Sequence, residues 1–219
     1  TEPSGGQQNK LLAICAAVGA SAAGDMHSLR AALEQHEFTG AAAEELFVSA
    51  CRRGHPDTVS ELLHGPYNLK PSAVCGSGFL AFRTACEHGH TAVVEMLLAE
   101  TGERRVDVHA RQEAAFISAC SNGHLAIVHM LLSLGGDRLI DASASQNAAF
   151  RAACKHNHVA VLQALLALAG DRAVDVGAMS FEGFRVACAS GHVEVVRLLV
   201  SQTGQHTTNT HTMDEEGFR

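Results

Sequence analysis

FRTACEHGHTAVVEMLL, residues 82–98, decides the fold because closely related stretches follow it at a constant spacing. The same pattern begins again at Phe116, Phe150 and Phe184, each time 34 residues further along the chain. A unit of this length is too small to bury its own apolar face, so it stacks on its neighbours in a repeat solenoid. We therefore predict an all-α array of helix-turn-helix units with a period of about 34 residues.

The pattern within one unit predicts two short helices. Phe82, Ala85 and Cys86 are spaced i, i+3 and i+4, so they share one face of a first helix, and Gly89 ends that helix. Apolar residues within 93–98 form the stripe that a second helix turns toward the core. The polar loop that leads from one unit into the first helix of the next is called the finger below.

Cysteine follows the same ladder and is expected to be structural. The chain has seven Cys, and four of them recur with the repeat at positions 86, 120, 154 and 188. Stacked helices lie about 8–10 Å apart, whereas a disulfide needs Cα atoms within about 7 Å. The ladder thiols are therefore expected to be free and buried, which favours a reducing compartment: the cytoplasm, or the cytosol of a host cell if the chain is a secreted effector.

Composition excludes several classes of function. The formal net charge is −7, which argues against a protein that neutralises nucleic-acid phosphates. The apolar run in residues 10–24 is too short to span a membrane. It imitates a signal peptide, but the Gly-Asp-Met-His that follows favours a capping repeat.

The repeat register divides the chain. Residues 1–9 are expected to be a disordered lead-in, and one array occupies 10–219. Met213 to Arg219 matches Met179 to Arg185 in register, so we expect an excerpt of a longer protein whose uncovered terminal repeat can self-associate. The expected units are 10–40, 41–74, 75–107, 108–141, 142–175, 176–209 and a partial unit 210–219.

These units resemble the ankyrin repeat family. The matching elements are Ala-Cys-x-x-Gly-His, then x-x-Val-Val-x-x-Leu-Leu, a Gly cap and a Val-Asp turn, and the match covers residues 10–219. The family's Thr-Pro-Leu-His opening is replaced here, for example by Ala-Ala-Phe-Ile at 114–117. The resemblance implies a long concave surface made by the fingers and the ends of the first helices, with fingers that are looser than usual.

No motif for catalysis is found, so we expect no enzyme activity and no cofactor. The sequence lacks a Gly-x-Ser-x-Gly nucleophile motif, a phosphate-binding loop and a His-Glu-x-x-His zinc motif. Among the fourteen His, those at 55, 90, 124, 158 and 192 stand between the two helices of successive units, where each ring is expected to hydrogen-bond the neighbouring turn. An alternative is metal or pH sensing through His88, His156, His206 and His211.

The resemblance also indicates where a partner would bind. Positions on the fingers and at the ends of the first helices are not used by the core ladder, and Phe181 stands out because its counterparts are Glu113 and Asn147. The candidate partner-binding residues are Arg52, Arg53, Phe79, Glu87, His88, Arg111, Glu113, Ser121, Asn122, Asn147, Lys155, His156, Met179 and Phe181.

The leading hypothesis is a non-catalytic scaffold that grips another protein, whose identity stays open, on the concave face. The alternative is a regulatory or substrate-recruiting arm of an enzyme whose catalytic domain lies outside this segment. Neither hypothesis involves nucleic acid, a membrane, a metal or a cofactor.

Overall fold

The computed structural model describes residues 16–35, 41–65, 78–170, 174 and 178–206, and within them every regular element is a helix. The all-α prediction is confirmed. The chain divides into two compact units: residues 1–119 with 126–140, and residues 120–125 with 141–219. No helix in the described part is both long and apolar enough to cross a bilayer.

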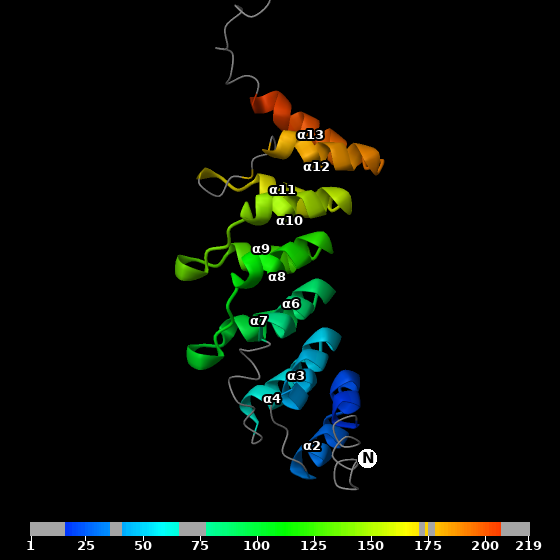
Figure 1. Ribbon diagram of the computed structural model, residues 1–219, viewed down its shortest axis with the longest axis vertical. Coiled ribbons are helices and arrows are strands. Elements are labelled where there is room, and N and C mark those ends of the chain that lie inside the picture. The colour runs from blue at the N-terminus through cyan, green and yellow to red at the C-terminus, as the bar shows by residue number, and fades with distance from the viewer. Residues whose placement is uncertain (1–15, 36–40, 66–77, 171–173, 175–177, 207–219) are drawn as a thin grey trace, which may run out of the picture. The chain divides into compact units, whose positions relative to one another are not determined.

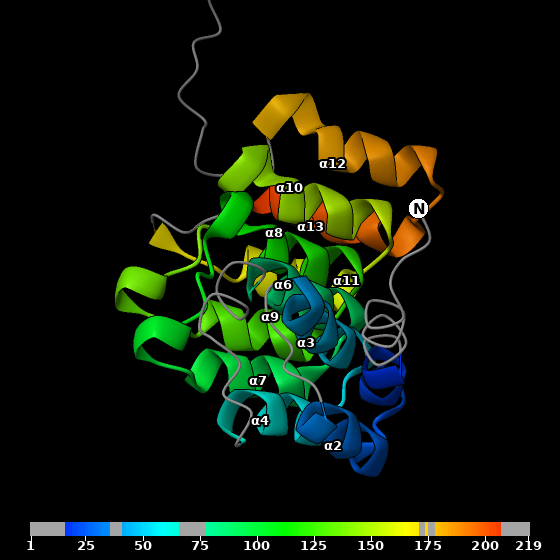
Figure 2. The ribbon, with the colours of Figure 1, turned by 60° about the horizontal axis from the view of Figure 1, so that its bottom comes forward.

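The helices of the first unit alternate between the first and the second helix of a repeat. The first helices α3 and α6 pack on each other, as do the second helices α4 and α7, which lie side by side in Figure 2. After residues 16–23, which are helical, the helices are α2 (Met26–Gln35), α3 (Ala41–Arg53), α4 (Pro56–His64), α6 (Gly78–His88), α7 (Thr91–Ala99), α8 (Ala110–Ser121) and α9 (Leu125–Leu132).

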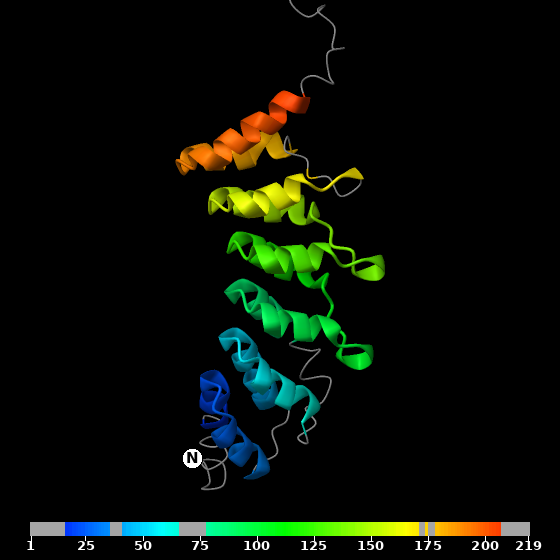
Figure 3. The ribbon, with the colours of Figure 1, turned by 180° about the vertical axis from the view of Figure 1, so that it is seen from behind.

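The second unit repeats this arrangement and takes in the end of α8 and the turn that follows it. First helix α10 packs on α12, and second helix α11 packs on α13, as seen from behind in Figure 3. The four helices are α10 (Ala144–Lys155), α11 (Val159–Leu166), α12 (Ala178–Ala189) and α13 (Val193–His206).

The apolar ladder forms the core of each unit. The aromatic ring at this position is at most 2% exposed in Phe47, Phe82, Phe116 and Phe150. The stripes of the second helices are buried with it, as Val93, Val94 and Leu97 show in α7. The helix faces predicted from the i, i+3, i+4 spacing are therefore the faces that the structure buries.

At four positions a histidine joins a repeat to the one before it. In every case the ring Nε2 donates a hydrogen bond to a backbone carbonyl at the end of the preceding first helix, where the helix itself provides no partner. This confirms the expected bond to the neighbouring turn for His55, His90, His158 and His192, and the bond of His124 stays a prediction. The pairs in the first unit are His55 with Ala22 O (2.9 Å) and His90 with Arg52 O (2.8 Å); in the second they are His158 with Ser121 O (2.9 Å) and His192 with Lys155 O (2.8 Å).

The glycine beneath the histidine has two reasons to lack a side chain. Gly54 has φ +73°, in the left-handed region, and a Cβ built there would overlap the ring of His90. Gly102 also has a left-handed φ, +61°, but a Cβ there would meet nothing within 4 Å. The two positions therefore separate the backbone cost of a substitution from the cost of displacing the histidine.

We expect Gly54→Ala to lower the free energy of unfolding by clearly more than Gly102→Ala. Both substitutions carry the left-handed cost of about 1–2 kcal/mol, and Gly54→Ala also disturbs a hydrogen bond worth about 1 kcal/mol. Urea denaturation of the two variants measures the difference. Equal losses would show that the ring of His90 is not held against Gly54.

The ladder thiols are free and mostly buried. Cys51, Cys86, Cys120 and Cys154 are buried, whereas Cys188 is exposed. Burial raises the pKa of each of these four buried thiols, and that of Cys154 reaches about 12. Of the four repeat positions expected to carry buried free thiols, Cys86, Cys120 and Cys154 are confirmed and the expectation is wrong for Cys188.

Alkylation should distinguish these thiols, because the thiolate is the nucleophile and burial suppresses it. At pH 8 we expect iodoacetamide to modify Cys188 in the folded chain and to modify the four buried cysteines only after denaturation. Peptide mapping by mass spectrometry reads the pattern. Modification of Cys86 as fast as that of Cys188 would contradict the packing described here.

Candidate partner-binding surface

Two finger turns project from the first unit on the same side of helices α6 to α9. They are the short 3-10 helices η1 (Gly102–Arg104) and η2 (Gly136–Arg138), visible as loops at the edge of Figure 1. Arg138 Nη1 donates to Leu98 O at the end of α7, 3.0 Å away. Burial, followed by repulsion from Arg105, lowers the pKa of the Arg138 guanidinium. Arg138 therefore ties its finger to the second helix of the preceding repeat.

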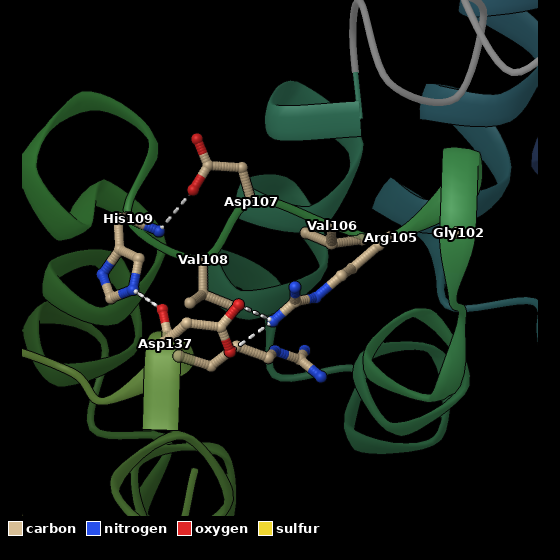
Figure 4. A pocket seen from close by; sticks show the side chains of 8 residues that line it. Gly102, Arg105, Val106, Asp107, Val108, His109 and Asp137 are labelled. Atoms are coloured by element: carbon tan, nitrogen blue, oxygen red, sulfur yellow. Dashed lines mark hydrogen bonds and ion pairs between the residues drawn. The ribbon is translucent and has the colours of Figure 1, made fainter. Parts of the chain in front are cut away.

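A cleft of about 330 Å³ lies between these fingers, and hydrogen bonds among its lining residues join the two fingers (Figure 4). Arg105 Nη2 lies 2.7 Å from the Asp137 carboxylate, and this bond holds the pKa of Asp137 below its ordinary value. The Asp107 carboxylate accepts a hydrogen bond of 3.0 Å from the backbone N–H of His109. We interpret these contacts as a structural link between adjacent fingers.

His109 completes this link by contacting two oxygens. Its Nδ1 lies 2.7 Å from Glu113 Oε1, and its Nε2 lies 2.8 Å from Asp137 O. A carboxylate and a carbonyl only accept hydrogen bonds, so both ring nitrogens can donate at once only in the imidazolium form. The Glu113 carboxylate, followed by the Asp137 carbonyl, accordingly raises the pKa of His109 above its ordinary value of 6.5.

Two of the candidate binding positions lie in the interior. Glu113 is 4% exposed and Asn147 is 6% exposed, so the expectation that these side chains face outward is wrong. The reason is a turn of three left-handed residues at 111–113 and again at 145–147, which directs the third side chain inward. Phe181 was singled out because Glu113 and Asn147 were expected to be its exposed counterparts. Both are buried, so that argument for Phe181 does not hold. The side chains of Phe181 and Met179 lie outside the described residues.

The other described candidates lie at the ends of the first helices, except Phe79 at the start of α6 and Arg111 at the start of α8. Phe79 is half-buried against Arg83 and Arg111, and Glu87 pairs with Arg83 at 3.1 Å. Ser121 is also half-buried. The exposed candidates are Arg52, Arg53, His88 and Arg111 in the first unit and Asn122, Lys155 and His156 in the second.

The exposed histidines stack on the ladder histidines. The rings of His88 and His90 are 6.0 Å apart and nearly parallel, and those of His156 and His158 are 6.2 Å apart. His88 Nδ1 donates to Thr84 O at 2.9 Å. Among the residues whose side chains are described, no three potential ligands gather where they could hold a metal ion. His211 and the side chain of His206 lie outside that part.

The comparisons with known proteins agree with this geometry. A family profile described as ankyrin repeats in three copies matches residues 46–141, 84–179 and 116–214, and the chain belongs to the ankyrin repeat family. The crystal structure of the ankyrin repeat domain of Bcl-3, a unique member of the IkappaB protein family, is similar with a TM-score of 0.59 and 21% identity over 85% of each chain. That likeness concerns the fold alone. No curated protein sequence matches the chain significantly.

The His109–Glu113 pair predicts a pH-dependent contribution to stability. Because the pKa of His109 is raised in the folded chain, the contribution is fully present below the ordinary value of 6.5 and is lost as pH rises through the folded pKa. We expect the difference in Tm between the native chain and Glu113→Gln to be largest below pH 6.5 and to shrink at higher pH.

Thermal melting followed by circular dichroism at constant ionic strength measures this difference. Glu45→Gln, which removes an exposed carboxylate from α3, is the matched control and should show no such trend. A Tm difference for Glu113→Gln that grows with pH would contradict the assignment of the bond.

Proposed function

We propose that this chain is a non-catalytic module that binds another protein on the concave face that the fold implies, through the ends of the first helices and the finger side. Ankyrin repeats are typically protein-interaction modules, and only such repeats are detected here. The proposal goes beyond that general statement by assigning the surface.

One observation carries the assignment. The buried positions of the first helices repeat from unit to unit, whereas the two residues at the end of each first helix, which are exposed or half-buried, change every time. They are Arg52-Arg53 at the end of α3, Glu87-His88 at the end of α6, Ser121-Asn122 at the end of α8 and Lys155-His156 at the end of α10. A constant backbone with a different polar pair at each step suits recognition of one particular partner.

The packing suits binding with little rearrangement. Each pair stands on a helix whose opposite face is buried, and a ladder histidine fixes the carbonyls at the same helix end. A backbone fixed in this way loses little conformational freedom on binding, so the main ordering cost is that of the side chains themselves. Arg and aromatic residues are the usual energetic anchors of such surfaces, which makes Arg53 and Phe79 the leading anchors in the first unit.

Charge reversal tests the surface. We expect Lys155→Glu and Arg53→Glu each to reduce capture of the partner from a cell lysate at least about fivefold, since each places a negative charge at a contact. Capture is quantified by mass spectrometry after circular dichroism shows native melting of each variant.

Arg197→Glu is the matched control, because Arg197 is exposed on second helix α13 and the charge change is the same. The control should capture the partner as well as the native chain does. Equal loss with Arg197→Glu, or no loss with either test variant, would place recognition elsewhere.

A further inference from the structure

Two guanidinium groups lie near the ring of Phe79 at the start of α6. The Cζ atom of Arg83 lies 6.0 Å from the centroid of the Phe79 ring, and that of Arg111 lies 5.2 Å from it. Arg83 stands one turn further along α6, whereas Arg111 belongs to α8 of the next repeat. Cations are attracted to the face of an aromatic ring, so the ring gathers both guanidiniums at one place. We call these three residues the Phe79 cluster.

One positive charge of the Phe79 cluster is not neutralised by the chain. Arg83 binds the Glu87 carboxylate at 3.1 Å, but the exposed Arg111 has no carboxylate partner among the described residues. Two carboxylates of its own finger serve other groups: Glu113 binds the neighbouring histidine, and Asp107 accepts a backbone hydrogen bond. Either carboxylate would therefore lose an existing hydrogen bond if it paired with Arg111.

The net charge of the whole chain is −7. An acidic protein generally repels acidic segments. A positively charged side chain on its binding surface therefore determines where such a segment can bind.

We propose that the Phe79 cluster binds a carboxylate side chain, and hence that the partner segment crossing the first unit is acidic. This inference rests on the proposed function and adds the chemistry of the partner. A guanidinium carries N–H donors in a planar fork that matches a carboxylate, and Arg111 is exposed, so it can form a two-point bond to a carboxylate from solution. A single uncompensated charge matches a monoanion, which favours Asp or Glu over a phosphate dianion.

Selection from a random peptide library displayed on phage, with the full chain as bait, tests the inference. We expect the native chain to select peptides with a recurrent Asp or Glu. Replacing that residue by Asn or Gln should weaken binding about tenfold, and Arg111→Gln should weaken binding of the original peptide by the same factor. The matched control Arg197→Gln should stay within about twofold, because Arg197 lies on second helix α13. Arg111→Glu should select basic peptides instead.

The outcomes separate this inference from the proposed function. Selected peptides that depend on Arg53 and Arg111 but carry no essential acidic residue would overturn the inference and leave the binding surface in place. Peptides that bind Arg53→Glu and Phe79→Leu as well as the native chain would overturn both. A phosphoserine in place of the acidic residue that binds more than about tenfold tighter would overturn the choice of a carboxylate. A selection that yields no peptide above background would also contradict the inference.

Discussion

The hydrogen bond from a histidine ring to the carbonyl of the preceding repeat is the interaction on which the rest of this structure depends. The last carbonyls of a helix have no partner within the helix, and here a side chain from the next repeat supplies one, as His90 does for Arg52 at 2.8 Å. The ring must pass close to the backbone of the earlier turn. The residue of that turn nearest the ring has a left-handed φ and no side chain, as in Gly54 beneath His90 and Gly123 beneath His158.

This constraint divides each repeat into fixed and free positions. The Gly-His pair joins one repeat to the next, and the apolar ladder fills the core. Exposed polar residues lie beside them at the helix ends. The fingers are joined separately, through Arg138 to α7 and through His109 to the next finger. A surface built on such supports can change its side chains without changing its shape, which is why we place recognition there.

Much of this fold can be predicted from the sequence, because repeats that pack in the same way carry the same residue types at a constant spacing. The spacing of Phe82, Ala85 and Cys86 predicts the buried face, and the recurring Gly-His predicts the bond between repeats. The finger side does not follow, because it depends on backbone conformation and on contacts between repeats. Glu113 is a charged residue in a polar stretch, and only the left-handed turn before it shows that it is buried. Likewise, Phe79 and Arg111 meet because α6 and α8 carry them together, and no local spacing indicates that contact.

The most direct test of this account is an NMR measurement of the ladder histidines. A carbonyl can only accept, so each ring must carry its proton on Nε2, and that nitrogen should show a scalar coupling across the hydrogen bond to the carbonyl carbon of the preceding repeat. We predict this coupling for His55, His90, His158 and His192. Rings protonated on Nδ1 alone, with no coupling to those carbonyls, would contradict the account.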